Sequence, residues 1–423
     1  MKRYEKYKPT GIQWLPEIPE YWKVQRFGSL FKRKVVANDP SKELLSVFLD
    51  RGVIKASESD KRTHQASDDL SKYQLVEPTD FVMNNQQAWR GSVGVSNFIG
   101  IISPAYHLFA MPSCYNPHYA NYLLRDRVMV NLYDMSSKGV GSIQRTLNFN
   151  WLNNGKCILP SITEQNKIVA YLNKRITLIE NCKCQREREL RTLNELKQAE
   201  IASVVTRGLN PDVPMKDSGQ IQFGKVPAHW DTIKLKYCFN QRSEKGFPNE
   251  PVLCATQSKG VIPQSLYENR VVVVNKGFDG LKLVKVGDFV ISLRSFQGGI
   301  EYAYYQGIIS SAYTILTPKD ERNSKYFKYL FKSHPFIQLL QTCVTGIREG
   351  QNINYSVLGN NFIPVPPIEE QNAIVEYIES KTSKIDTMIE ALKAEIDRLT
   401  EYKQRLISDV VTGQIDVRGE QIQ

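Results

Sequence analysis

Apolar residues recur every three or four positions along two long stretches of the chain, one in the middle and one near the end. Such steps place one apolar face along a helix, and a seven-residue period is typical of a helix that packs against another. In the second stretch the seam consists of Ile385, Ile389, Leu392, Ile396, Leu399, Leu406 and Val410. In the first stretch it consists of Leu172, Ile176, Ile179, Leu190, Leu193 and Val204. The pattern predicts two long helices, the first about 65 Å long from Thr163 to Val205.

Charged residues interrupt both seams. They are Lys183, Arg186, Lys197 and Glu200 in the first stretch and Lys403 in the second, and the first stretch also has a polar run at 181–188. Neither helix can bury its seam in water alone, so we expect the two to pack against each other as an antiparallel coiled coil. The alternative is that each helix packs only on the globular domain next to it.

The chain is a tandem repeat with a spacing of about 207 residues. The matched residues are Pro19 and Pro227, Trp22 and Trp230, Asp80 and Asp288, Tyr106 and Tyr313, Gln165 and Gln371, and Thr206 and Thr412, at offsets that fall from 208 to 206. Matches that keep one order at a nearly constant offset indicate two copies of one unit.

Before each long helix the sequence changes character. Short runs rich in β-branched and aromatic residues, such as 44–48, 80–83 and 289–292, are separated by Gly and Asn turns, which is typical of strands. The expected fold is therefore α/β of the α+β kind, with two mostly β domains in tandem joined by two long helices. The expected boundaries are 1–160 for the first domain, 161–207 for the first helix, 208–366 for the linker and second domain, and 367–423 for the second helix and tail.

Composition narrows the class of protein. The net charge is +11, with 55 Lys and Arg against 44 Asp and Glu, and the apolar content is 41%. These values suit a globular chain, and no apolar run approaches the roughly 18 residues of a membrane helix, so we expect a cytoplasmic protein without a membrane partner. The seven cysteines form no Cys-x-x-Cys pair, and the five histidines lack ligand spacing, so no metal site is predicted.

No catalytic motif is evident in the sequence. There is neither a Gly-x-x-x-x-Gly-Lys-Ser/Thr phosphate loop nor a His-Glu-x-x-His zinc helix. The run 116–119, Asn-Pro-His-Tyr, resembles the Asn-Pro-Pro-Tyr of adenine methyltransferases, but the second copy reads Asn-Ser-Lys-Tyr at 323–326. We therefore interpret Asn116 and Pro117 as the cap and first turn of a helix.

Binding of nucleic acid is better supported than catalysis. An excess of basic residues favours contact with phosphates, and matched loops in the two copies combine an aromatic ring, a guanidinium, an amide and a glycine. Arg suits guanine and Gln or Asn suits adenine in the major groove, because each side chain forms a bidentate pair. The candidate DNA-binding residues are Gln86, Gln87, Trp89, Arg90, Lys138, Gln144, Arg145, Arg294, Phe296, Gln297, Arg348, Gln351 and Asn352.

Taken together, the repeat resembles the specificity subunit of type I restriction–modification systems. Each copy opens with Pro-x-x-Trp, at 19–22 and 227–230, and Glu-Gln at 164–165 and 370–371 begins each long helix. The helices end in Val-Val-Thr at 204–206 and 410–412. The resemblance spans essentially the whole chain.

This resemblance implies a non-catalytic subunit in which each β-rich target-recognition domain reads one half of a split site in double-stranded DNA. It also implies that the helices set the distance between the two halves. The partners would be two methyltransferase subunits, which use S-adenosylmethionine to methylate adenine, and restriction subunits driven by ATP and Mg²⁺. No cofactor is expected in this chain. The competing hypotheses are a helix-spaced structural scaffold and a DNA-binding protein unrelated to modification.

Overall fold

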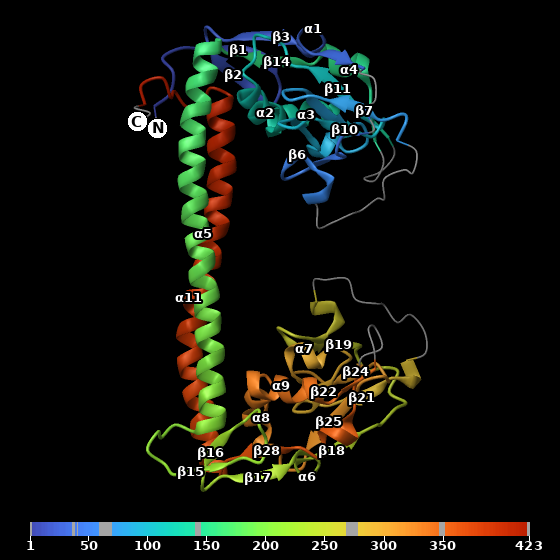
Figure 1. Ribbon diagram of the computed structural model, residues 1–423, viewed down its shortest axis with the longest axis vertical. Helices are drawn as coiled ribbons and strands as arrows, with labels where there is room; N and C mark the ends of the chain where they lie inside the picture. The colour runs from blue at the N-terminus through green and yellow to red at the C-terminus, as the bar shows by residue number, and fades with distance from the viewer. Residues whose placement is uncertain are drawn as a thin grey trace. The chain divides into compact units, whose positions relative to one another are not determined.

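The computed structural model of the chain describes residues 2–35, 39, 41–58, 70–139, 145–267, 278–346 and 352–420 (Figure 1). The fold divides into two compact units. Unit 1 comprises Met1–Arg186 and Glu395–Gln423, and unit 2 comprises Glu187–Ala394. Each unit therefore contains one globular domain and a part of both long helices. Among the helices of these described ranges, none has an apolar stretch that could cross a membrane.

The globular domain of unit 1 is built of short strands with a few short helices. Its strands are β1 Tyr7–Ile12, β2 Leu15–Pro19, β3 Lys23–Arg26, β4 Lys32–Lys34, β5 Leu45–Phe48, β6 Gly52–Lys55, β7 Gln74–Val76, β8 Phe81–Asn84, β9 Val93–Val95, β10 Gly100–Ile102, β11 Tyr106–Ala110, β12 Ser137–Lys138, β13 Thr146–Leu147 and β14 Lys156–Leu159. Its helices are α1 Phe27–Leu30, η1 Ala56–Glu58, η2 Ala88–Arg90, α2 Pro117–Arg125, α3 Arg127–Met135 and α4 Phe149–Asn154.

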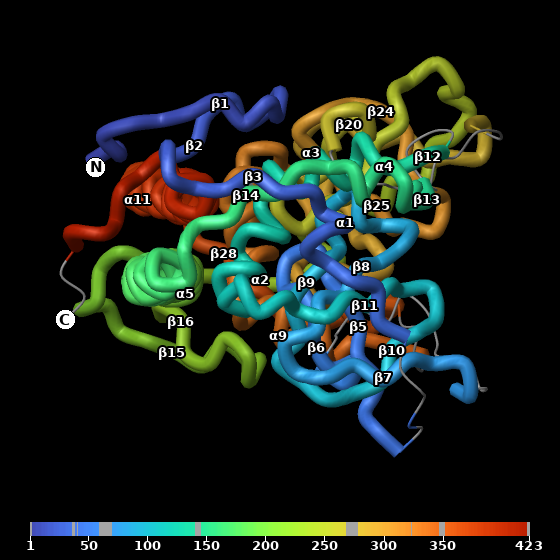
Figure 2. Tube along the Cα trace, turned by 90° about the horizontal axis from the view of Figure 1, so that it is seen from above, coloured from blue at the N-terminus to red at the C-terminus, as the bar shows by residue number. Residues whose placement is uncertain are grey.

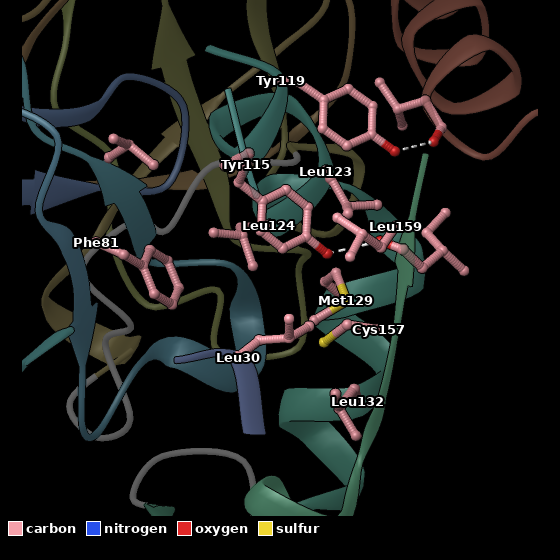
Figure 3. Packing of buried hydrophobic residues seen from close by; sticks show 14 of the residues in the cluster. Leu30, Phe81, Tyr115, Tyr119, Leu123, Leu124, Met129, Leu132, Cys157 and Leu159 are labelled. Carbon is pink, nitrogen blue, oxygen red and sulfur yellow. Dashed lines mark hydrogen bonds between the residues drawn. The ribbon is translucent and has the colours of Figure 1, made fainter. Parts of the chain in front are cut away.

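A four-stranded antiparallel sheet in the order β4-β11-β8-β9 organises this domain. Phe81 and Phe109 face each other across β8 and β11, and both are buried in the core. Helices α2 and α3 complete the core with Leu123, Leu124 and Met129 (Figure 3). As the sequence predicts, the Asn116 side chain caps α2 by accepting from two backbone N–H groups, and Pro117 occupies the first turn.

Unit 2 repeats this arrangement. Its strands are β15 Met215–Asp217, β16 Lys225–Pro227, β17 Asp231–Lys234, β18 Phe239–Arg242, β19 Leu253–Thr256, β20 Gly260–Pro263, β21 Lys282–Val284, β22 Phe289–Ile291, β23 Glu301–Tyr302, β24 Gly307–Ile309, β25 Thr314–Pro318, β26 Val344–Thr345, β27 Asn352–Ile353 and β28 Phe362–Val365. Its helices are α6 Leu235–Cys238, η3 Gln264–Leu266, η4 Phe278–Gly280, α7 Ser295–Gly298, η5 Glu321–Asn323, α8 Ser324–Leu330, α9 His334–Thr342 and α10 Tyr355–Leu358. The sheet order β18-β25-β22-β23 is the counterpart of β4-β11-β8-β9, which confirms the tandem repeat.

The two long helices are α5, Ile162–Arg207, and α11, Ile368–Val411. They run antiparallel in each unit and lie side by side when viewed along their axes (Figure 2). In unit 1 Lys403 pairs with Glu180 at 2.6 Å and Arg186 with Glu395 at 3.0 Å. In unit 2 Lys197 pairs with Asp386 at 2.5 Å. The antiparallel pairing expected from the seams is thus confirmed.

Three of the residues that interrupt the apolar seams form these ion pairs. Lys403, Arg186 and Lys197 each bond to a carboxylate of the opposite helix, and Glu200 accepts a hydrogen bond from the Tyr377 hydroxyl at 2.5 Å. The seam residues are buried to two different degrees. Buried are Leu172, Ile179, Val204, Ile389, Leu406 and Val410, and half-buried are Ile176, Leu190, Leu193, Ile385, Leu392, Ile396 and Leu399.

Each globular domain also packs on one end of both long helices. In unit 1 the Tyr119 hydroxyl donates to the carbonyl of Val411 at 2.9 Å, near the end of α11 (Figure 3). In unit 2 the Tyr326 hydroxyl donates to Val205 at 2.9 Å, near the end of α5. The first turns of each helix join the core of the domain that precedes it, for example through Ile168 and Ile374. The ends of the long helices therefore pack on the neighbouring globular domain, as in the alternative given above. Over the remainder of their length the two helices pack on each other.

The repeated Trp and Glu residues make the same contact in both units. The buried Glu164 carboxylate accepts hydrogen bonds from the Trp22 indole at 3.0 Å and from the Tyr4 and Tyr21 hydroxyls at 2.7 and 2.9 Å. In unit 2 the Trp230 indole donates to Glu370 at 2.9 Å. These bonds attach the start of each domain to the start of its helix.

We expect Glu164→Ala to lower the free energy of unfolding of unit 1 by about 2–4 kcal/mol, because it leaves buried donors without an acceptor. Glu5 is exposed, and Glu5→Ala should change that free energy by less than about 0.5 kcal/mol. Urea denaturation of both variants, followed by circular dichroism, measures the difference. Equal denaturation midpoints for the two variants would show that the junction does not depend on this carboxylate.

Candidate nucleic-acid interface

The candidate DNA-binding residues of unit 1 lie on the turn after β8 and on the hairpin β12–β13. Gln86 and Arg90 are exposed, whereas Gln87 and Trp89 are half-buried. The turn has a fixed shape: the Asn84 side chain accepts from the backbone N–H groups of Gln86 and Gln87, and the Trp89 indole donates to the Gln86 carbonyl at 3.0 Å.

The structure brings two guanidinium groups close to the ring of Trp89. The Arg145 guanidinium lies 4.6 Å from the centre of the indole ring, and that of Arg90 lies 5.7 Å from it. Arg145 also forms an ion pair with Asp134 at the end of α3. The hairpin is further attached to the turn by the Leu147 N–H, which donates to the Asn85 side chain at 3.3 Å. Guanidinium groups held beside an aromatic face can contact the phosphates and the base edges of a DNA duplex.

A second aromatic–cation pair joins the same hairpin to α4. The exposed Lys138 ammonium is 4.7 Å from the ring centre of Trp151, whose side chain is 49% exposed. Trp151 is not predicted from the sequence, because its spacing does not distinguish it from an ordinary residue of α4. Gln144 lies outside the described residues.

In unit 2 the corresponding residues lie on and beside the short helix α7. Arg294 and Gln297 are exposed and Phe296 is half-buried. Gln341 of α9 donates to the Phe296 carbonyl at 3.4 Å. Asn352 is exposed on β27, where it pairs with Thr345 of β26. The strands β26 and β27 pair antiparallel, as β12 and β13 do in unit 1. Arg348 and Gln351 lie outside the described residues.

Glycines with a left-handed backbone end both loops. Gly91 has φ +98° and Gly299 has φ +86°, a conformation that side chains with a Cβ rarely adopt. The two glycines match at an offset of 208 residues. Turns at matched positions therefore present different side chains in the two units: Trp89 and Arg90 in unit 1, and Phe296 and Gln297 in unit 2.

Each globular domain also contains a buried ionisable group with a shifted pKa. Burial raises the pKa of Glu301 to about 7, although the neighbouring Lys332 acts in the opposite direction. Burial also lowers the pKa of His107 to about 4, with a further lowering by Arg33, so this imidazole is neutral at physiological pH. Among the described residues, no group of three or more His, Cys, Asp or Glu is placed to hold a metal ion.

Comparison with known proteins shows that the chain is similar to proteins of restriction–modification systems. A family model described as "Type I restriction modification DNA specificity domain" matches residues 227–398. The putative type I restriction enzyme MjaX specificity subunit of Methanocaldococcus jannaschii is 25% identical over 71% of this chain and 69% of its own length. The type I restriction enzyme MjaVIII specificity subunit of the same organism is 22% identical over 95% of both chains.

The fold also matches a solved structure. A chain described under "Structural basis underlying complex assembly and conformational transition of the type I R-M system" has a TM-score of 0.66 and 16% identity, over 94% of this chain and 99% of that one. At this identity the match concerns the fold: paired long helices and two mixed globular domains along one chain.

Proposed function

We propose that the chain, which is similar to specificity subunits of type I restriction–modification systems, is itself such a subunit and reads a bipartite DNA site. Each globular domain would read one half. The observation that supports this most directly is the cluster of Trp89, Arg90 and Arg145, which joins an aromatic face to two guanidinium groups on an exposed turn. The equivalent turn at α7 in unit 2 presents Arg294, Phe296 and Gln297 for a second reading surface.

In this proposal the paired helices fix the spacing between the half-sites and dock two methyltransferase subunits. S-adenosylmethionine would be bound by those subunits, and ATP and Mg²⁺ by restriction subunits that join the complex. This chain would contribute no catalytic group. Adenine methylation and ATP-dependent cleavage would belong to the complete complex, which the specificity subunit directs to its site.

We expect Trp89→Ala to weaken binding of the purified chain to double-stranded DNA about 2- to 30-fold, because the ring lies against the Arg90 and Arg145 guanidinium groups that would contact the duplex, and cation–π contacts contribute about 0.5–2 kcal/mol. Tyr402 on α11 is a matched control, since its aromatic ring is 45% exposed and belongs to the helix pair. Titration of labelled duplex with both variants and the unchanged chain, at one fixed salt concentration, gives the affinities.

The same titration tests the proposed function itself. A DNA-reading subunit should bind duplex, and with its methyltransferase subunits it should direct methylation to a split sequence. A helix-spaced scaffold would bind no duplex at any salt concentration. Equal affinities of Trp89→Ala and Tyr402→Ala for the duplex would show that the turn after β8 is not part of the DNA interface.

A further inference from the structure

In unit 2 a single ammonium group connects three separate segments beneath the loop at α7. Lys332 Nζ donates to the Gly298 carbonyl at 2.9 Å, to the Gln257 carbonyl at 3.2 Å and to Glu301 Oε1 at 2.6 Å. Gly298 ends α7, Gln257 lies in the turn between β19 and β20, and Glu301 begins β23. An ammonium group has three donors, so these bonds use all of them.

The carboxylate in this cluster depends on the lysine. Glu301 is 2% exposed, and among the described residues its Oε2 atom has no hydrogen-bond partner. A buried carboxylate without a partner is costly, so removal of Lys332 would disturb the backbone around Glu301 as well as that of Gly298. The cluster therefore couples the position of α7 to β23.

Close backbone packing leaves α7 little freedom to adjust. Any Cβ on Gly299 would collide with the carbonyl oxygen of Phe331, the residue before Lys332. A Cβ on Gly298 would lie 2.9 Å from the side chain of Gln257. The end of α7 is thus held between the β19–β20 turn and the end of α8, at the point where Lys332 bonds to it.

Unit 1 has a cationic side chain at the corresponding position but no carboxylate beside it. Arg125 matches Lys332 at an offset of 207, and its Nη2 donates to the Leu49 carbonyl at 3.1 Å. Leu49 matches Gln257 at an offset of 208, whereas Val93 occupies the position of Glu301. A cation bound to the hairpin turn is therefore common to both units, and the buried carboxylate with its bond to the recognition turn is specific to unit 2.

We propose that Lys332, together with Glu301, is a positioning residue for the second DNA-reading loop. It fixes the backbone from which Arg294, Phe296 and Gln297 project, and so sets the sequence discrimination of one half-site without contacting DNA. Base readout depends on bidentate geometry, and a loop that moves by about 1 Å loses that geometry. This inference rests on the proposed function.

The test uses the complex of the full chain with its methyltransferase subunits. We expect Lys332→Met to reduce discrimination between matched and mismatched bases about tenfold or more in one half-site, and to leave the other half-site unchanged. Lys332→Arg, which can still bond to carbonyl and carboxylate oxygens, should restore part of that discrimination. Lys325→Met is the matched control, because Lys325 is an exposed lysine of α8, the helix that ends two residues before Lys332. Methylation rates on a library of single-base variants of the site give all four profiles.

Two outcomes overturn this inference, and a third concerns the proposed function. If Lys332→Met reads both half-sites as the unchanged chain does, Lys332 does not position the loop. If discrimination falls equally in both half-sites, its role is general stability. If the unchanged chain directs no split-site methylation, the proposed function fails instead. Should Lys332→Met not fold, the double variant Lys332→Met with Glu301→Leu removes the buried charge as well, and the same half-site comparison applies.

Discussion

Exchange of residues 1–160 for the corresponding segment of another specificity subunit is expected to change one half of the recognised DNA site completely. The physical reason is that the second domain keeps its own core. Its cluster of buried residues includes Trp230, Phe289 and Phe331 and belongs entirely to unit 2. Each base pair contributes about 1–3 kcal/mol of discrimination, so a half-site of several pairs should switch its preference by more than about 100-fold.

The exchange must preserve the contacts between domain and helices. The incoming segment needs a tryptophan at the position of Trp22 for Glu164, and a tyrosine at the position of Tyr119 for the carbonyl of Val411. An exchange in which Trp22 is also replaced by Phe provides a control for the junction, since it should lower stability while leaving the new half-site preference as it is. Mapping of methylated adenines measures both halves at once. Coupled changes in both halves would contradict independent reading.

Much of the fold can be predicted because the repeat and the seam are periodic. The repeated residues prove to be the junction contacts: Trp22 and Trp230 bond to Glu164 and Glu370, which adjoin the Gln residues matched in the sequence. The matched acids Asp80 and Asp288 are buried and pair with Lys34 at 2.8 Å and Arg242 at 3.0 Å. A spacing can show that such residues correspond, but not which partner each one has.

The charged residues in the seam show the limit of pattern analysis. Lys197 looks like an interruption when α5 is considered alone, because its partner Asp386 is supplied by the other helix. Which residue lies opposite Lys197 depends on the register between the two helices. The heptad pattern of one helix alone does not determine that register.

The candidate interface was predictable in outline only. The matched loops predict the turn at Trp89 and the turn at Phe296 as DNA-binding candidates. They do not predict a role for Trp151 or Lys332. Lys332 is separated from Gln257 by 75 residues along the chain, and their contact exists only after β19, β20 and α8 have packed together. Contacts of this kind form through tertiary packing, so no local sequence motif predicts them.

Insertion of four residues into both long helices is expected to lengthen the DNA spacer by roughly one or two base pairs. The insertions belong after Arg186 in α5 and before Glu395 in α11, because these two residues pair with each other at 3.0 Å. The ion pairs Glu180–Lys403 and Lys197–Asp386 then keep their partners on either side of the insertion. Four residues add about 6 Å of helix and leave the apolar seam nearly in phase.

On DNA, about 6 Å corresponds to nearly two base pairs at about 3.4 Å each, and two pairs also turn the duplex by about 70°. Part of that rotation must be absorbed by twist in the helix pair or in the DNA, which is why the expected gain falls below two full pairs. Each half-sequence should stay the same. A seven-residue insertion at the same points retains the heptad phase fully, adds about 10.5 Å and should lengthen the spacer by about three pairs.

A four-residue insertion in α5 alone is the control for this experiment. It shifts the register of α5 against α11 beyond the insertion, separates Lys197 from Asp386 and should destabilise the helix pair without defining a new spacer. Mapping of methylated adenines for the paired and single insertions distinguishes the cases. If a folded, active complex with paired insertions still methylates sites with the original spacer, the helices do not measure the distance, and the spacing must be set by contacts that the domains make with DNA or with the methyltransferase subunits.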